Sequence, residues 1–188
     1  MADNNTSIVL IGMPGAGKST IGVMLAKLTC RSFVDTDVLI QSSQGKTLQD
    51  IVDREGHLAL RSIEEQVILK VDCRNCVIAT GGSAVYSPAA MAHLRQNGMV
   101  IYLDAELSVL EARVQDLDTR GLAKRPDQSF RELYEERTPL YAKYADITIE
   151  SGNLAHEEIC ARIIEELPKG HGKSAAGDQC TIKRKSKK

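Results

Sequence analysis

The stretch that decides the fold is Ile8-Val9-Leu10-Ile11-Gly12-Met13-Pro14-Gly15-Ala16-Gly17-Lys18-Ser19-Thr20. Its first four residues are apolar and mostly β-branched, which is typical of a buried strand. Residues 21–28, directly behind it, carry apolar side chains at helical spacing. A strand, a glycine-rich turn ending in Lys-Ser, and a helix together form the P-loop pattern. We therefore predict a phosphate-binding loop between a first strand and a first helix.

The glycine-rich turn supplies the groups that a triphosphate needs. Its glycines allow tight backbone turns, so that consecutive N–H groups converge on a phosphate, and the positive end of the following helix adds to their field. Lys18 can reach the outer phosphates, and the Ser19 hydroxyl can take a place on Mg²⁺. The same short pattern occurs by chance in unrelated chains, but the flanking strand and helix favour the functional interpretation. We therefore expect the protein to bind a nucleoside triphosphate.

Length and composition indicate a single soluble domain. The chain has 188 residues, of which 43% are apolar and 26% charged, and these values are ordinary for one globular α/β domain. No run approaches the roughly 20 apolar residues that span a bilayer. Residues 1–6 lack the basic and apolar segments of a secretory signal, so we expect a cytoplasmic protein. Cys73 and Cys76 have CxxC spacing, but without a second pair we interpret them as incidental thiols.

The carboxyl-terminal segment differs from the rest of the chain. Residues 169–188 carry seven Lys or Arg against one acid, Asp178, whereas the whole chain has a net charge of −1. The segment is rich in Gly, Ser and Ala and lacks hydrophobic periodicity, so we expect it to be disordered. We predict one domain over residues 1–168 followed by this basic tail. Such a tail can contact nucleic acid or anionic lipid, but a solvated terminus is commoner, and we expect no nucleic-acid partner.

Strand and helix patterns alternate along the chain. Short apolar runs indicate five strands, at residues 8–11, 32–34, 76–79, 100–103 and 147–149. Helical spacing indicates helices at residues 21–28, 38–43, 47–54, 57–71, 88–96, 106–117, 130–144 and 154–167. Strands that alternate with helices require a parallel sheet covered on both faces. The predicted fold is an α/β, three-layer αβα fold with five parallel strands.

Asp35-Thr36-Asp37 follows the second predicted strand. Ligands of parallel sheets bind beyond the carboxyl ends of the strands, a rule that also selects residues 80–83 and Asp104. On an extended strand end, Asp35 and Asp37 would point into one space. One carboxylate could hold Mg²⁺, and the other could orient an attacking hydroxyl or take its proton. The alternative is that the pair caps the following helix, but next to a P-loop we favour the functional interpretation.

Three arginines suggest an anionic substrate. Arg61 lies in a predicted helix, where it could instead pair with Glu64 or Glu65, and Arg120 lies in an irregular basic segment. A flexible basic segment over a triphosphate can exclude water and neutralise the transferring group. Arg137 precedes a Thr-Pro-Leu-Tyr run. A single arginine is more often a surface residue, but three around one site would indicate a carboxylate substrate, which arginine binds through two hydrogen bonds.

Taken together, these motifs resemble the shikimate kinase family of P-loop enzymes, which is related to the nucleoside monophosphate kinases. The resemblance covers residues 7–167 and rests on the P-loop, the aspartate pair, Gly81-Gly82 and the spaced arginines. It implies an ATP-dependent kinase that moves the γ-phosphate to the 3-hydroxyl of shikimate, giving shikimate 3-phosphate and ADP on the route to aromatic amino acids. It also implies the strand order 2-3-1-4-5, a mobile lid and Mg²⁺ as cofactor. We expect a monomer.

The resemblance assigns roles to individual residues. Lys18, Asp37 and Arg120 would be catalytic, with Asp37 as the base and Arg120 as the lid arginine. Ser19 and Asp35 would hold Mg²⁺. The residues that bind ATP would be Gly12, Gly15, Ala16, Gly17, Lys18, Ser19, Thr20, Arg113, which packs on adenine, and Arg120. The residues that bind the small carboxylate-bearing substrate would be Asp37, Arg61, Gly81, Gly82 and Arg137, the arginines holding its carboxylate.

Two positions depart from the family pattern. Ser83 replaces the third glycine of a run, and Gly121 replaces the proline that usually follows the lid arginine. Arg125, which does precede a proline, is therefore a rival lid arginine. Ser83 adds a hydroxyl beside the acceptor, so a related kinase for another hydroxy acid, such as homoserine or gluconate, stays open. A non-catalytic ATP-binding module is disfavoured because the key P-loop and aspartate residues are all present.

Overall fold

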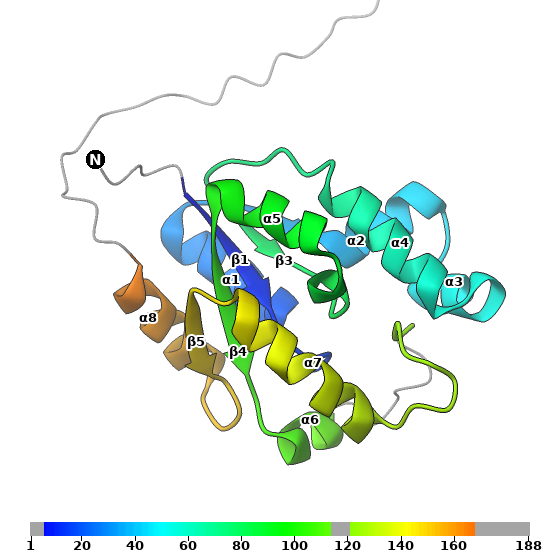
Figure 1. The fold of residues 1–188 in the computed structure, drawn as a ribbon. Coiled ribbons are helices and arrows are strands. Elements are labelled where there is room, and N and C mark those ends of the chain that lie inside the picture. The colour runs from blue at the N-terminus through cyan, green and yellow to red at the C-terminus, as the bar shows by residue number, and fades with distance from the viewer. Residues whose placement is uncertain (1–5, 114–120, 168–188) are drawn as a thin grey trace, which may run out of the picture.

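The computed structural model describes residues 6–113 and 121–167. Five parallel strands form one sheet in the order β2-β3-β1-β4-β5, which confirms the predicted order (Figure 1). In chain order the strands are β1 (Ser7–Ile11), β2 (Ser32–Asp35), β3 (Cys76–Ala79), β4 (Gly98–Asp104) and β5 (Ile147–Glu150). Every residue of β1 and β3 is buried, as expected for central strands with continuous apolar sequence.

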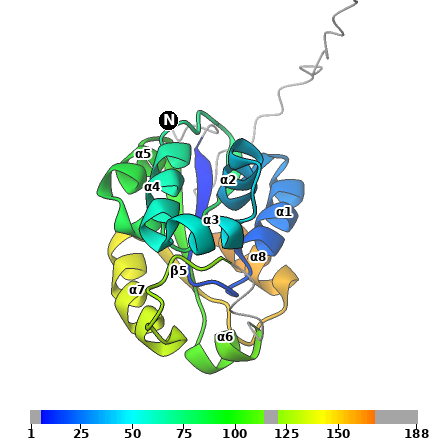
Figure 2. The ribbon, with the colours of Figure 1, turned by 90° about the vertical axis from the view of Figure 1, so that its right-hand side faces the viewer.

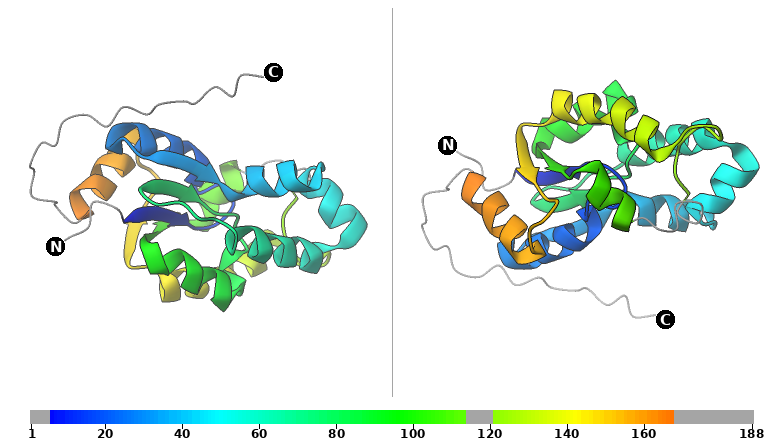
Figure 3. Two further views of the ribbon diagram at one scale, coloured as in Figure 1. Left: turned by 90° about the horizontal axis from the view of Figure 1, so that it is seen from above. Right: turned by 90° about the horizontal axis from the view of Figure 1, so that it is seen from below.

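Helices cover both faces of the sheet, as predicted (Figure 3). On one face lie α1 (Lys18–Thr29) and α8 (His156–Glu166), which pack on each other. On the other face lie α5 (Pro88–Asn97) and α7 (Phe130–Tyr144), which both contact β4. The short helix α6 (Leu107–Arg113) follows β4. The main core fills the two interfaces between sheet and helices, with Leu10, Leu25, Met91 and Leu133 fully buried.

A helical lobe stands beyond the carboxyl edge of the sheet (Figure 2). It consists of α2 (Thr36–Gln44), α3 (Leu48–Glu55) and α4 (His57–Ile68), which contact one another. Thr47 begins α3 with a complete capping box, in which Thr47 and Asp50 exchange side-chain-to-backbone hydrogen bonds. The lobe has a small core of its own, formed by Ile40, Ile51, Leu60 and Ala123. Because Ala123 belongs to the segment before α7, that segment packs against the lobe.

The loop between α4 and β3 differs from its prediction. Cys73 and Cys76 are joined by a disulfide, so the interpretation as two incidental thiols is wrong. Asn75, between them, has a φ of 53°, and this left-handed turn brings the two Cα atoms to 6.2 Å. After β3, a 3₁₀ turn, η1 (Ala84–Tyr86), leads into α5.

Some predictions concern residues that the structure leaves undescribed. Arg120, at the start of the predicted lid segment, and the basic tail at residues 169–188 lie outside the described residues. Within residues 6–113 and 121–167, no helix has the length and apolar character needed to span a membrane.

Candidate active site

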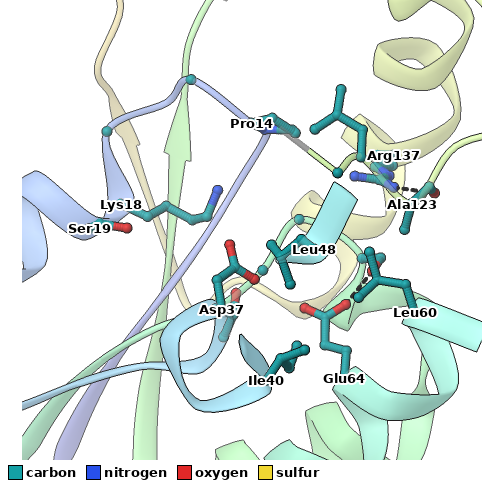
Figure 4. A pocket seen from close by; sticks show the side chains of 18 of the residues that line it. Pro14, Lys18, Ser19, Asp37, Ile40, Leu48, Leu60, Glu64, Ala123 and Arg137 are labelled. Carbon is teal, nitrogen blue, oxygen red and sulfur yellow. Dashed lines mark hydrogen bonds between the residues drawn. The ribbon is translucent and has the colours of Figure 1, made fainter. Parts of the chain in front are cut away.

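A cavity of about 510 Å³ lies at the carboxyl edge of the sheet, beside the P-loop (Figure 4). The P-loop and the start of α1 form one side, and α2, α4 and the loop after β3 form the other. Residues 121–123 and α7 complete the wall. The predicted site residues that line it are Gly15, Gly17, Lys18, Ser19, Thr20, Asp37, Gly81, Gly82, Arg113 and Arg137. The structure thus brings residues from both halves of the chain to one space.

The P-loop takes its shape from its glycines and from the start of α1. Gly12 has a φ of 147°, and a Cβ there would lie 2.7 Å from the backbone oxygen of Leu103, so glycine is required. Ala16 is buried, and its N–H donates to the Met13 carbonyl at 3.1 Å. Gly17 caps α1 without a side-chain hydrogen bond to the helix. The first N–H groups of α1 therefore lack a side-chain partner and can serve a phosphate.

Lys18 is buried, and its ammonium group is held inside the P-loop. Its Nζ donates to the carbonyl oxygens of Gly12, at 2.8 Å, and of Met13, at 2.9 Å. An ammonium group has three N–H donors, so one remains for a phosphate oxygen. Burial lowers the pKa of Lys18 to about 8, and the negative charge of Asp37 opposes this decrease. Phosphate oxygens near the ammonium would favour its charged form.

The exposed side of the P-loop carries polar side chains. Ser19 and Thr20, at the start of α1, are exposed and line the cavity. Arg113, at the end of α6, donates to the carbonyl oxygens of Gly15, at 3.4 Å, and of Gly152, at 2.8 Å. His156, the first residue of α8, lines the same region. Arg113 therefore links the P-loop to the loop that follows β5.

Asp35 and Asp37 have different environments. Asp35 ends β2 and caps α2, because its Oδ1 accepts the N–H groups of Asp37, at 3.0 Å, and Val38, at 3.3 Å. Asp37 lies in the first turn of α2, so the prediction that both carboxylates share a face of an extended strand end is wrong. The capping alternative is correct for Asp35. Asp37 nonetheless lines the cavity, where burial raises its pKa and the Lys18 ammonium opposes the rise.

Gly81 and Gly82 form a floor next to the end of β3. The Gly81 N–H donates to the Thr36 hydroxyl at 2.9 Å, and the Tyr141 hydroxyl donates to the Gly82 carbonyl at 2.6 Å. Each glycine is therefore held in place by a hydrogen bond between its backbone and a side-chain hydroxyl group. A Cβ at Gly82 would lie only 2.8 Å from Nη1 of Arg137. Because neither glycine has a side chain, the space beside Gly81 holds the carboxyl oxygens of Asp37 and Glu64, and the space beside Gly82 holds the guanidinium group of Arg137.

Arg61 and Arg137 converge on Tyr86 and Ala123. The guanidinium carbon of Arg61 lies 3.6 Å from the centre of the Tyr86 ring, and that of Arg137 lies 5.3 Å from it. Both arginines donate to the Ala123 carbonyl, at 3.2 Å and 2.9 Å respectively. Arg137 is only 1% exposed. Two guanidinium groups around one carbonyl oxygen retain unused donors, and a carboxylate is the group that best fits such a pair.

Of the two candidate lid arginines, Arg125 is among the described residues and Arg120 is not. Arg125 is exposed, and its Nη1 lies 3.4 Å from Oε2 of Glu136. It is absent from the described lining of the cavity, so its position does not support the lid role. Arg120 lies outside the described residues.

Sequence reasoning missed Glu64, Tyr86 and His156 as site residues. Glu64 lies three residues after Arg61, and this spacing on α4 places the two on neighbouring positions of one helix face. Among the described residues, two buried side-chain polar atoms lack a hydrogen-bond partner, Nε of Arg61 and Oε1 of Glu64. One is a donor and one an acceptor. Glu64 lines the cavity, whereas Arg61 is absent from its described lining and bonds to Ala123 of its wall. Buried polar atoms without partners are rare, and a ligand would explain them.

The sequence and the fold are both similar to those of known proteins. The family model described as "Shikimate kinase" matches residues 14–168. A shikimate kinase of Symbiobacterium thermophilum is 39% identical over 166 residues, which cover 86% of this chain and 95% of the relative. A shikimate kinase of Caldanaerobacter subterraneus subsp. tengcongensis is 34% identical over 170 residues, which cover 89% of this chain and 99% of the relative.

Two solved structures show the same similarity in three dimensions. Shikimate kinase from Acinetobacter baumannii in complex with shikimate superposes with a TM-score of 0.78 at 31% identity, covering 87% of this chain and 96% of the other. Shikimate kinase from Aquifex aeolicus vf5 has a TM-score of 0.72 at 30% identity, covering 86% of this chain and 95% of the other.

Proposed function

Because the chain belongs to the shikimate kinase family, we propose that the cavity beside the P-loop is where it transfers a phosphate from ATP to shikimate. The protein is an ATP-dependent kinase that phosphorylates shikimate, and the alternatives homoserine and gluconate are not favoured. The observation that carries the residue roles is that Lys18, Asp37 and Arg137 line one cavity. A phosphate-binding cation, a carboxylate base and a carboxylate-binding guanidinium group are thereby within reach of one small acceptor.

ATP is bound, in this proposal, along the P-loop and the exposed side of α1. The backbone N–H groups of residues 12–17 and the start of α1 surround the β- and γ-phosphates, and Lys18 donates its third N–H to them. Arg113 stands at the edge of the cavity, bonded to the P-loop and to Gly152, and packs on the adenine. Arg120 would join the γ-phosphate from the segment after α6.

Mg²⁺ is the cofactor that the residues present would accommodate. The Ser19 hydroxyl lines the cavity, and the Asp35 carboxylate uses Oδ1 for capping, which leaves Oδ2 for a metal or its water. Within the described residues no group of three His, Cys, Asp or Glu side chains could hold a metal ion by itself, which suits an ion bound largely through phosphates and water. When bound, Mg²⁺ supplies positive charge that neutralises the phosphates during transfer.

The acceptor is bound between the guanidinium groups and Asp37. Arg61 and Arg137 hold the shikimate carboxylate, with Nη1 of Arg137 directed at the space above Gly82. Asp37 accepts a hydrogen bond from the 3-hydroxyl and takes its proton as the oxygen attacks. The bond from this oxygen to the γ-phosphorus forms, the bond from that phosphorus to the β,γ-bridging oxygen breaks, and ADP leaves. Burial, which raises the pKa of Asp37, makes it a better proton acceptor during transfer.

An ADP-release assay tests this function directly. We expect ADP to appear at a rate that depends on shikimate, with homoserine and gluconate giving at most a small fraction of that rate at equal concentration. Omission of Mg²⁺ should abolish release, and added Mg²⁺ should restore it. Faster release with homoserine or gluconate than with shikimate would overturn the acceptor. A monomeric state, a cytoplasmic location and a domain boundary at residue 168 remain predictions.

A further inference from the structure

Tyr86 is a half-buried aromatic residue that the transfer described above does not use. It ends η1, which packs against both α4, the helix of Arg61, and α7, the helix of Arg137. The guanidinium carbon of Arg61 lies over its ring, 3.6 Å from the ring centre. Its hydroxyl oxygen accepts a hydrogen bond from Nε of Arg137 at 3.3 Å. One side chain thus contacts both arginines that are proposed to hold the acceptor carboxylate.

Neither of these arginines forms an ion pair with a carboxylate in the described parts of the chain. Glu64, three residues after Arg61 on α4, accepts the hydroxyl hydrogen of Ser83 instead. Two guanidinium groups that lie close together without a carboxylate repel each other, so something else must hold them. The face of an aromatic ring attracts a cation and leaves its N–H donors free. Tyr86 therefore keeps the pair together while most of their donors remain available to a ligand carboxylate.

The hydrogen bonds of Arg137 fix the direction of its third nitrogen. Its Nε bonds to the Tyr86 hydroxyl, and its Nη2 donates to the Ala123 carbonyl at 2.9 Å (Figure 4). A planar guanidinium group with two of its three nitrogens bonded cannot rotate freely. Nη1 is thereby directed at the space beside Gly82, where a Cβ would lie 2.8 Å from it. Arg137 and Gly82 both line the cavity, so the Tyr86 hydroxyl helps to aim this donor at the acceptor.

Glu136 is linked to this pair through the Tyr86 hydroxyl. The hydroxyl donates to Oε1 of Glu136 at 2.6 Å, and Oε2 of Glu136 accepts from Nε2 of Gln128 at 2.6 Å. Burial raises the pKa of Tyr86, and its bond to Glu136 raises it further, so the phenol keeps its hydrogen at neutral pH. The same bond is the main cause that lowers the pKa of Glu136, which is therefore ionised. The carboxylate thus orients the phenol without pairing with Arg61 or Arg137.

We propose that Tyr86 is a positioning residue for the acceptor carboxylate. Its ring and its hydroxyl hold the guanidinium groups of Arg61 and Arg137 together, and Glu136 fixes the hydroxyl. Tyr86 is absent from the described lining of the cavity, so it acts through the arginines and not on the acceptor itself. The inference rests on the proposed function and deepens it. It makes Tyr86 a determinant of the preference for an acid over an uncharged acceptor with the same ring.

The test compares two acceptors, shikimate and its methyl ester, in steady-state ADP release at saturating ATP. The ester keeps the ring and its hydroxyl groups and lacks the negative charge. The variants are Tyr86→Phe, which removes only the hydroxyl, and Tyr86→Leu, which also removes the ring. Circular dichroism and thermal unfolding establish that each variant is folded. Tyr86→Phe is the milder change and provides the answer if Tyr86→Leu does not fold.

Tyr144→Phe and Tyr144→Leu are the matched controls. Tyr144 ends α7, and its ring also has a cation nearby, since Nζ of Lys143 lies 5.3 Å from the ring centre. It is half-buried like Tyr86 and is likewise absent from the described lining of the cavity. The controls therefore remove the same groups and the same kind of contact without touching the two arginines.

We expect the unaltered chain to prefer shikimate over the ester by about tenfold or more in kcat/KM, as for hydrogen bonds to a charged group. Tyr86→Phe should reduce this preference about threefold and Tyr86→Leu about fivefold or more. The change should come from a higher KM for shikimate, with kcat within about twofold of its original value. The controls should leave the preference unchanged.

An unchanged preference in the folded Tyr86 variants, or equal losses for the two acceptors, would overturn the positioning role. If the unaltered chain uses both acceptors equally, the positioning role fails and the kinase activity stands. If ADP appears with neither acceptor, the proposed function fails with it.

Discussion

At the scale of the residue, four of the ionisable side chains that line the cavity affect one another. Lys18 and Arg137 contribute positive charge, and Asp37 and Glu64 contribute carboxyl groups. Because they are shielded from water, removing one leaves its neighbours without compensation. Substitution of any one of these side chains should therefore change both ligand binding and the pKa values of the others.

Asp37→Asn is expected to remove turnover while ATP binding survives. Asparagine keeps the size of the side chain but cannot take the proton of the attacking hydroxyl, so kcat should decrease by roughly 10²- to 10⁴-fold. Steady-state ADP release measures kcat, and titration of ATP by calorimetry measures binding. An unchanged kcat in the variant would exclude Asp37 as the base or the orienting group.

Arg61→Lys is expected to raise KM for shikimate, because lysine cannot form two parallel hydrogen bonds to a carboxylate and stacks less well on Tyr86. The increase should be about tenfold or more, with a much smaller change in kcat. Arg95→Lys is the matched control, since Arg95 pairs with the exposed Asp146, which directly precedes the amino-terminal end of β5. If the two variants have the same KM, Arg61 does not bind the acceptor.

Glu64→Gln is expected to change how stability depends on pH. The pKa of Glu64 is about 7 in the folded chain, above the ordinary value of 4.5 that applies after unfolding. The folded state therefore binds more protons between these values, and the free energy of unfolding decreases as pH rises through this range. Relative to the unaltered chain, the variant should gain up to about 3 kcal/mol between pH 5 and pH 8 in urea unfolding. A pH-independent difference would contradict the raised pKa.

Residue types and their spacing could predict Lys18, Asp37 and Arg137 as partners in one site, because each stands in a motif with a known chemical use. Glu64 and Ser83 could not be paired in this way. They lie 19 positions apart and meet only because α4 packs next to η1. Asp35 illustrates a second limit, since one sequence pattern is compatible both with a helix cap and with a metal ligand, and the structure shows the cap.

At the scale of the element, the segment before α7 depends on its contacts with the helical lobe. The N–H of Gly121 donates to Oε1 of Gln49 at 2.7 Å, and Ala123 packs into the core of the lobe. Helix and strand periods predicted the regular elements but not this contact, which depends on how an irregular segment packs on the helices of the lobe. It also explains the departure from proline at position 121, because proline has no N–H and cannot adopt the φ of 60° found there.

Gly121→Ala is expected to be more destabilising than Gly45→Ala. Both glycines have a φ near 60°, so both variants should lose about 1 kcal/mol from backbone strain. A Cβ at Gly45 meets nothing within 4 Å, whereas a Cβ at Gly121 would lie 2.4 Å from the backbone nitrogen of Gln49. Urea unfolding should therefore show an additional loss of about 1–3 kcal/mol for Gly121→Ala. Equal losses would mean that the segment does not pack on α3 in solution.

At the scale of the whole molecule, the five parallel strands place every loop of the site at one edge. The alternation of strand and helix patterns predicted the three layers, because such alternation leaves only a parallel sheet covered on both faces. The strand order came from the resemblance to a family, since periodicity alone does not determine which strands are neighbours. The helical lobe was predicted as separate helices, but its role as the far wall of the cavity required the folded structure.

The identity of the phosphorylated oxygen tests the whole account most directly. After incubation with ATP, Mg²⁺ and shikimate, proton–phosphorus correlation NMR of the product should show a single phosphate coupled to the hydrogen on C3, in an amount equal to the ADP released. A phosphate on another hydroxyl group, or ADP released together with inorganic phosphate and without a phosphorylated acid, would contradict an acceptor held by Arg61 and Arg137 with its 3-hydroxyl at Asp37.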